Sequence, residues 1–221
     1  FRECERLGIN YLELGSSVLY DPEARGKIIS VSKKLNILLH NYIPAPKKPF
    51  VLNLASLDKD SLNKSRKLVE NALWISSEIE APFFGVHSGF AYYAEPEFLG
   101  KKQTHLKHFP LMEAAQIFRE SIHILSKEAQ RSGVKLLIEN NVVSVENLVD
   151  HENKSYLMAD SEGSLALLED FNDLNVHLLL DLGHLNVSAT SLNFQCYNAY
   201  ILKFRKGIVF YLNLNKFIFY L

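Results

Sequence analysis

The chain has 221 residues, of which 48% are hydrophobic and 22% charged, so it can bury a sizeable core and fits a single domain. Its formal net charge of −1 provides no broad cationic field, which disfavours nucleic acid as a partner and favours a small polar substrate. The two cysteines, Cys4 and Cys196, give neither a disulfide framework nor the spacing of a structural zinc site, and we expect a reducing, cytoplasmic location.

The chain opens with a predicted short amphipathic helix and a strand. Residues 1–10 (FRECERLGIN) form the helical pattern, which Gly8 ends, and residues 11–15 (YLELG) form the strand. Phe1 is not an initiator methionine, and charged residues follow it where a signal peptide would be apolar, so we expect the start to be cut or incomplete. No apolar stretch approaches the roughly twenty residues that a membrane span requires, and we expect no membrane partner.

The chain then alternates between apolar strands and helical patterns. The predicted strands are short apolar runs at residues 35–40 (LNILLH), 83–87 (FFGVH), 134–140 (VKLLIEN) and 176–181 (VHLLLD). Helical patterns at residues 58–80, 111–133 and 164–171 lie between them, and Gly133 occupies the position of a C-terminal cap. Five such strands without a glycine-rich dinucleotide fingerprint favour an α/β fold of the TIM (β/α)8-barrel type over a doubly wound sheet.

We assign residues 1–190 to this barrel domain and residues 191–221 to an atypical C-terminal tail. Helical periodicity is lost after Thr190, and Phe, Tyr, Leu, Asn and Lys dominate. GIVFYLNLN, at residues 207–215, is compatible with one more strand, and the final KFIFYL is either a last strand or an exposed, aggregation-prone end. We therefore expect an incomplete barrel, with the first strand missing and the last strands degenerate.

The predicted strands end in side chains that can bind a metal ion. Parallel barrels place their active sites at the carboxyl ends of the strands, so these side chains should converge on one face. A single histidine at a strand end is more often structural, and a lone carboxylate is often a helix cap, but five coincidences favour a site for zinc, manganese or magnesium. The five predicted ligands are His40, His87, Glu139, Asp181 and His184.

Three further residues are assigned to substrate binding: Asn41, Asn140 and Lys47. Lys47 and its neighbour Lys48 follow His40 closely in sequence, where a phosphate group of the substrate could meet them. A solvated turn is the alternative interpretation of the lysine pair.

Five segments that contain these residues carry a family resemblance. LLHNYIPAP, PFVLNLAS, FFGVHSGF, LLIENN and LLLDLGHLNVSA, within about Arg6 to Thr190, resemble the xylose-isomerase-like TIM-barrel superfamily of sugar phosphate isomerases and epimerases, which also includes the endonuclease IV family. The resemblance to sugar epimerases implies that Glu139 and Asp181 bind a divalent metal and that proton transfer at a substrate carbon is metal-assisted. The endonuclease IV pattern adds the three histidines named above as ligands.

The chain also departs from the superfamily pattern. Relatives complete the metal site with a histidine from the seventh strand and a glutamate from the eighth. Residues 207–215 contain no histidine, and no glutamate follows Asp181. The resemblance therefore implies an under-coordinated metal, and we expect the chain as written to be weakly active or inactive.

Two classes of function follow from these residues. The first is a divalent-metal-dependent isomerase or epimerase for a sugar or sugar phosphate, in which the metal polarises the substrate and Glu139 is the catalytic residue that moves the proton. The alternative is an endonuclease IV-like phosphodiesterase acting on abasic DNA, which His40 and His87 favour and the near-neutral charge opposes. An inactive fragment of the barrel is a third interpretation, and the sequence does not indicate an oligomeric state.

Overall fold

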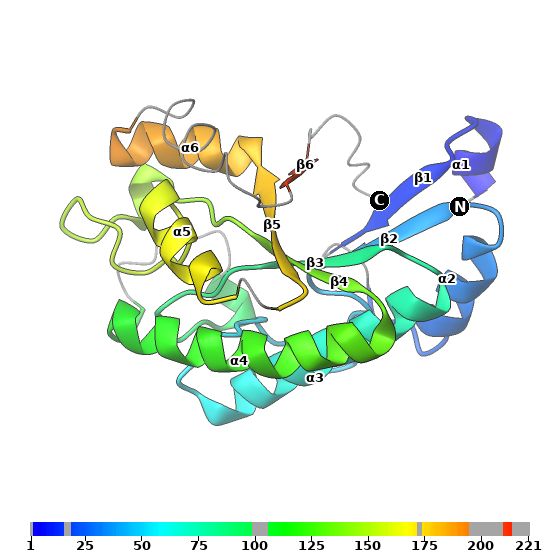
Figure 1. The fold of residues 1–221 in the computed structure, drawn as a ribbon, viewed down its shortest axis with the longest axis horizontal. Coiled ribbons are helices and arrows are strands. Elements are labelled where there is room, and N and C mark those ends of the chain that lie inside the picture. Colours follow the sequence, from blue (N-terminus) through cyan, green and yellow to red (C-terminus); the bar gives the residue numbers. More distant parts are fainter. Residues whose placement is uncertain (1, 16–18, 99–105, 172–173, 195–209, 214–221) are drawn as a thin grey trace.

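A computed structural model of the chain contains one parallel sheet of six strands (Figure 1). It describes residues 2–15, 19–98, 106–171, 174–194 and 210–213. The strands follow one another across the sheet in chain order: β1 (Tyr11–Leu14), β2 (Asn36–His40), β3 (Phe83–His87), β4 (Lys135–Glu139), β5 (Val176–Asp181) and β6 (Phe210–Asn213). Because every neighbouring pair is parallel, the carboxyl ends of all six strands lie along one edge of the sheet.

Helices make the crossover connections that neighbouring parallel strands require. The helices are α1 (Arg2–Arg6), α2 (Ala24–Ser32), α3 (Lys59–Glu78), α4 (Leu111–Ser132), α5 (Ser161–Glu169) and α6 (Leu182–Leu192), with single 3-10 turns at Pro96–Phe98 and Val145–Asn147. From β1 to β6, one α-helix lies between each strand and the next in the chain. This strict alternation is the βα repeat of a TIM barrel.

The two long helices begin and end where their sequences predict. Asp58 is the N-cap of α3, and its side chain accepts a hydrogen bond of 2.8 Å from the backbone N–H of Ser61. Gly133 ends α4 in the left-handed conformation, with φ 71°, which costs glycine little because it has no Cβ. The chain then continues from α3 into β3 and from α4 into β4, and these two strands pair in the sheet.

The main core lies between the sheet and the pair α3 and α4, which pack side by side against it (Figure 1). Phe84 and Leu136 of the strands and Leu73 and Phe118 of the helices are fully buried. Removing one such side chain from water contributes about 1.5–3 kcal/mol to folding. The core therefore holds rigid the strands whose ends carry the candidate ligands.

The predicted fold class is confirmed. The five predicted strands lie within one residue of their expected bounds and are mutually parallel. Within the described residues the sheet does not close on itself, since β1 and β6 each pair with one strand only. β6 lies inside GIVFYLNLN, whereas the final KFIFYL is outside the described residues, and the domain boundary at residue 190 stays a prediction.

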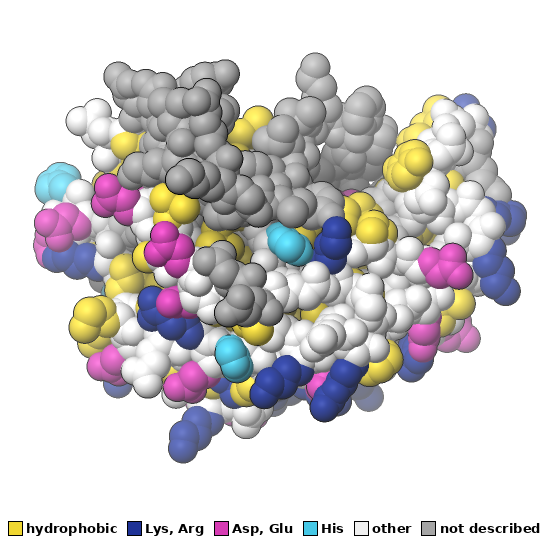
Figure 2. Space-filling view, viewed as in Figure 1, with side chains coloured by type: hydrophobic (Ala, Val, Ile, Leu, Met, Phe, Trp, Pro, Cys, Tyr) yellow, Lys and Arg dark blue, Asp and Glu magenta, His cyan; other side chains and the backbone are white. Residues whose placement is uncertain are grey.

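The described surface mixes charges of both signs. On the face drawn in Figure 2, basic and acidic side chains are interspersed over the described residues and do not gather into one basic patch. None of the helices described is long and apolar enough to cross a membrane.

Candidate metal centre

Four adjacent strands place a potential ligand at the same edge of the sheet. His40, His87, Glu139 and Asp181 are the last residues of β2, β3, β4 and β5, and His184 lies in the first turn of α6. His87 and Glu139 are direct register partners. The parallel register thus produces the convergence that the sequence predicts, and the role of these five residues as metal ligands stays a prediction.

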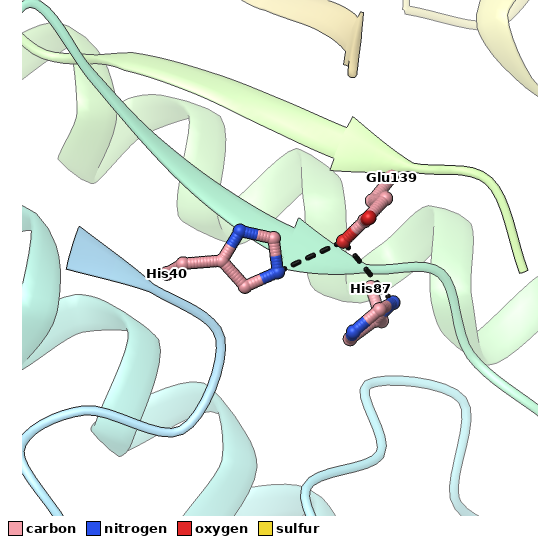
Figure 3. A group of neighbouring side chains, drawn as sticks. All are labelled: His40, His87 and Glu139. Atoms are coloured by element: carbon pink, nitrogen blue, oxygen red, sulfur yellow. Dashed lines mark ion pairs between the residues drawn. The ribbon is translucent and has the colours of Figure 1, made fainter. Parts of the chain in front are cut away.

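Glu139 lies at the centre of a first group of potential ligands. Its Oε2 atom is 2.8 Å from Nε2 of His40 and 3.2 Å from Nδ1 of His87, and both rings lie beside this carboxylate (Figure 3). One ligand atom from each of the three residues lies within 4.8 Å of the other two. Atoms at that separation can surround a single ion, because zinc binds its nitrogen and oxygen ligands at about 2.0–2.2 Å.

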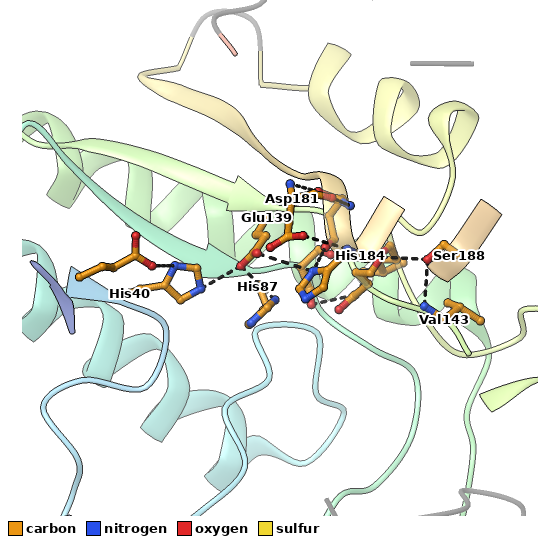
Figure 4. Close-up of polar contacts among 12 residues, drawn as sticks. His40, His87, Glu139, Val143, Asp181, His184 and Ser188 are labelled. Carbon is orange, nitrogen blue, oxygen red and sulfur yellow. Dashed lines mark hydrogen bonds and ion pairs between the residues drawn. The ribbon is translucent and has the colours of Figure 1, made fainter. Parts of the chain in front are cut away.

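A second group shares Glu139 and adds Asp181 and His184. Oε1 of Glu139 is 3.6 Å from Nδ1 of His184, and Figure 4 shows Glu139 between His40 and His184. Asp181 is the N-cap of α6, and its Oδ1 accepts a hydrogen bond of 2.8 Å from the backbone N–H of His184. The first turn of the helix therefore fixes the spacing between these two residues.

The carboxylates at this centre are suited to a cation. Glu139 and Asp181 are each only 2% exposed. Oε2 of Glu139 makes no well-aligned hydrogen bond, although imidazole nitrogens of His40 and His87 lie 2.8 Å and 3.2 Å from it. A buried carboxylate needs a positive partner, and a protonated imidazole or a bound ion can fill that role. Two carboxylates with three imidazoles are a donor set that zinc and manganese accept, so the residues fit a divalent ion.

Mutual contacts set the protonation states of the first group. Burial lowers the pKa of His40, but the adjoining carboxylates of Glu13 and Glu139 outweigh burial and raise the pKa to about 10. Burial raises the pKa of Glu139, but His87, His40 and His184 outweigh it and lower the pKa to about 2. Burial also lowers the pKa of His87 to about 4, with Glu139 opposing the shift. In the metal-free protein at neutral pH, His40 is therefore cationic, Glu139 anionic and His87 neutral.

These shifts predict that the metal-free protein is most stable near pH 6.5. The raised pKa of His40 stabilises the fold fully below 6.5, and this contribution is lost as the pH rises toward 10. The lowered pKa of Glu139 stabilises the fold above 4.5, and this contribution is lost as the pH falls toward 2. His87 adds a loss between pH 6.5 and 4, because the unfolded chain takes up that proton first.

Thermal unfolding in the presence of a chelator, followed by circular dichroism across this pH range, measures the profile. A His40→Gln variant is expected to lose the part of the alkaline decline that the imidazole causes. If the variant and the wild type decline equally above neutral pH, the assignment to His40 is wrong.

Asn140 ties the end of β4 to the end of β5. Its Nδ2 donates to the backbone oxygen of Asp181 at 3.2 Å, and its Oδ1 accepts from the backbone N–H of Asp181 at 2.7 Å. Its own backbone carbonyl accepts from Nδ1 of His184 at 2.9 Å, which leaves Nε2 of that ring available to an ion. Since Asn140 is 1% exposed, these contacts support a role in positioning two ligands, and its contact with substrate stays a prediction.

The other two predicted substrate-binding residues lie on the loop that follows β2. Asn41 comes directly after His40 with a left-handed φ of 54°, and its backbone N–H donates to the carbonyl oxygen of Gly85 at 2.7 Å. Lys47 is exposed farther along the same loop. Contact of either residue with a substrate stays a prediction.

The sequence analysis missed one carboxylate beside the centre. Oε1 of Glu13, in β1, lies 3.0 Å from Nδ1 of His40. Glu13 is the next-to-last residue of its strand, whereas the other potential ligands on strands are last residues. On the predicted strand, residues 11–15, Glu13 lies two positions before the end, so a search extended by two positions on each predicted strand would have found it.

Comparisons with known proteins agree with this architecture. The family model described as xylose isomerase-like TIM barrel matches residues 1–213, and no curated protein matches the chain in sequence. A D-tagatose 3-epimerase-like protein superposes with a TM-score of 0.60 at 17% identity, over 92% of this chain and 66% of its own. The D-psicose 3-epimerase of Clostridium cellulolyticum, solved with D-tagatose, gives 0.58 at 16% identity, over 84% and 58%.

The description of a third solved structure names a zinc salt. A protein from Thermus thermophilus, from crystals soaked with ZnCl2, gives a TM-score of 0.52 at 20% identity, over 83% of this chain and 61% of its own. The chain thus spans 58–66% of the length of these three structures. At such identities the likeness shows the fold.

Proposed function

The chain belongs to the xylose isomerase-like TIM barrel family, and from this premise we propose that it is a divalent-metal-dependent isomerase or epimerase acting on a sugar or sugar phosphate. Structures of similar fold are described as a D-tagatose 3-epimerase-like protein, a D-psicose 3-epimerase and an L-ribulose 3-epimerase, which supports a sugar as the substrate class. The observation that carries the metal dependence is the buried Glu139, shared by two groups of potential ligands.

The ion would be held by Glu139 together with Asp181 and His184, and the adjoining histidines His40 and His87 face the same carboxylate from the other side. Imidazole nitrogen favours zinc or manganese over magnesium, which prefers oxygen ligands and retained water. Nδ1 of His184 is bonded to a backbone carbonyl, as is usual for histidines that bind a metal through the other nitrogen. These contacts support the assignment of the three residues as ligands.

The bound ion would supply Lewis-acid polarisation of the carbonyl and hydroxyl groups of the substrate. The chain itself supplies the proton acceptor. Because the neighbouring histidines lower the pKa of Glu139 to about 2 against the effect of burial, this side chain is ionised at neutral pH, the state that both ion binding and acceptance of a substrate proton require. Asn140 keeps the opposite carboxylate in place through its two bonds to the backbone of Asp181.

A phosphodiesterase of the endonuclease IV type is the second candidate. The observation in its favour is the group of His40 and His87 around Oε2 of Glu139, which offers a second ion position next to the first. Two adjacent metal ions can activate water and stabilise a leaving oxygen. The formal net charge of −1 and the interspersed charges in Figure 2 count against a DNA partner.

We expect the purified chain to retain zinc or manganese after dialysis and to interconvert at least one ketose or ketose phosphate, weakly but above the rate of the chelated protein. Metal content by mass spectrometry and product analysis on a panel of sugars measure both. Cleavage of abasic DNA without sugar turnover would select the second candidate. Retained metal with neither activity would identify an inactive barrel, and a chain that binds no divalent ion at all would overturn the proposal.

A further inference from the structure

Glu13 reaches the metal centre from a strand that contributes no candidate ligand. In the register of β1 and β2, Glu13 pairs with Leu38. Successive side chains alternate between the faces of a sheet, so Glu13 shares a face with Leu38 and with His40, two residues farther along. The register therefore explains why Oε1 of Glu13 lies 3.0 Å from Nδ1 of His40.

The imidazole of His40 makes a different contact at each nitrogen. Nδ1 faces Glu13, whereas Nε2 faces Oε2 of Glu139 at 2.8 Å. A neutral imidazole carries one N–H, and the nitrogen without it can bind a metal. Both neighbours are carboxylates, which can only accept hydrogen bonds, so each favours an N–H on the nitrogen that faces it. When an ion takes the place of the proton on Nε2, the remaining proton lies on Nδ1, where Glu13 accepts from it.

The backbone of β3 restricts the same ring from another direction. Gly85 is the register partner of His40, and a Cβ atom placed on Gly85 would lie 3.2 Å from Nδ1 of His40 and 3.0 Å from Cδ2 of Leu179. The absence of that Cβ lets the ring lie close against the strand. The side chain of His40 is only 12% exposed, so the ring is enclosed apart from its two polar contacts.

We propose that Glu13 is a positioning residue that fixes the orientation of His40 and holds the proton on its Nδ1 once Nε2 binds a metal. Nε2 of His40 and Oε2 of Glu139 then face a divalent ion in the first group of potential ligands, next to the ion position at Asp181 and His184; this inference rests on the proposed metal centre. A carboxylate behind a histidine ligand commonly raises metal affinity, because it orients the ring and increases the basicity of the ligating nitrogen. Within the described residues, Glu13 pairs with His40, and not with Glu139 or with the second group, Asp181 and His184. Its ion pair with His40 also contributes to the stability of the metal-free protein, through the raised pKa of His40, so metal affinity and unfolding have to be measured separately.

The test is zinc affinity, measured by competition with a chromophoric chelator, for the wild type and three variants. Glu13→Ala is expected to bind Zn²⁺ about 10–100-fold more weakly, the usual cost of removing such a partner. Glu13→Gln is expected to retain much of the affinity, because the amide oxygen can still accept from Nδ1. Glu169→Ala is the matched control: it removes an exposed carboxylate from the last residue of α5, at the opposite end of the strands, and should bind as the wild type.

A second readout separates positioning from a general structural effect. In the zinc-loaded wild type, long-range ¹H–¹⁵N spectra should show His40 protonated at Nδ1 and metal-bound at Nε2. Glu13→Ala should lose that single tautomer and Glu13→Gln should keep it, while circular dichroism shows that both variants are folded. Wild-type zinc affinity in Glu13→Ala would overturn this inference alone. A wild type that binds no zinc would overturn the proposed function together with it.

Discussion

Replacing Glu139 with glutamine is expected to abolish metal-dependent turnover and to weaken divalent-metal binding by more than about 100-fold, beyond the effect of losing a residue that only supports a ligand. The variant keeps the shape of the side chain but removes its charge. Glu139 belongs to both groups of potential ligands, whereas Asp181 belongs to one, so the substitution removes a charged ligand from each group. Metal binding is measured as metal content after dialysis. Turnover is measured with the sugar that the wild type converts fastest.

The control is Glu169→Gln, the same chemical change at an exposed position on α5, which should leave both quantities unchanged. Circular dichroism of the Glu139→Gln protein shows whether the fold survives. A folded Glu139→Gln protein that keeps the wild-type metal content would show that the ion, if any, binds elsewhere.

The second large effect is expected from Asn140→Ala, which should lower the free energy of unfolding by about 2–4 kcal/mol. The substitution removes two hydrogen bonds between the buried amide of Asn140 and the backbone of Asp181, one donated and one accepted by the side chain. Metal affinity should also fall, because Asp181 would no longer be held against the end of β4. Urea unfolding, at fixed pH and in the presence of a chelator, measures the change in the free energy of unfolding without a contribution from bound metal.

Asn186→Ala provides the comparison, because Asn186 is exposed on α6 and its replacement should change stability by less than about 0.5 kcal/mol. A substrate-binding role for Asn140 predicts the opposite pattern: unchanged stability and metal affinity with a raised KM. That result would support the contact with substrate that the sequence predicts for Asn140.

The sheet could be predicted from the sequence because its strands are short, apolar and bounded. The predicted strands FFGVH and VHLLLD have the same first and last residues as β3 and β5. Such runs are buried on both faces, so their composition alone distinguishes them from the amphipathic helices between them. Once the strands are parallel, their last residues must lie along one edge, and the convergence of His87, Glu139 and Asp181 follows without any knowledge of side-chain contacts.

The contacts that orient these side chains could not be predicted in the same way. Glu13 meets His40 because of the register between β1 and β2, and register is not visible in a single sequence. Asn140 resembles a substrate-binding residue in sequence because it directly follows a proposed ligand. Its side chain turns along the sheet to the backbone of the next strand, a direction that depends on how closely β4 and β5 approach each other.

Because Asp181 caps α6, the second ligand group is preorganised to bind an ion. One carboxylate oxygen of Asp181 is held by the N–H of His184, so the two side chains keep their separation through a single helical turn and need no reorganisation when an ion arrives. Unwinding the first turn of α6 would displace His184 and break its hydrogen bond to the carboxylate of Asp181, while Asn140 still holds the backbone of Asp181. Fraying of this helix end should therefore weaken the hold on the ion, and hydrogen exchange at the amide of His184 should report on how tightly the ion is held.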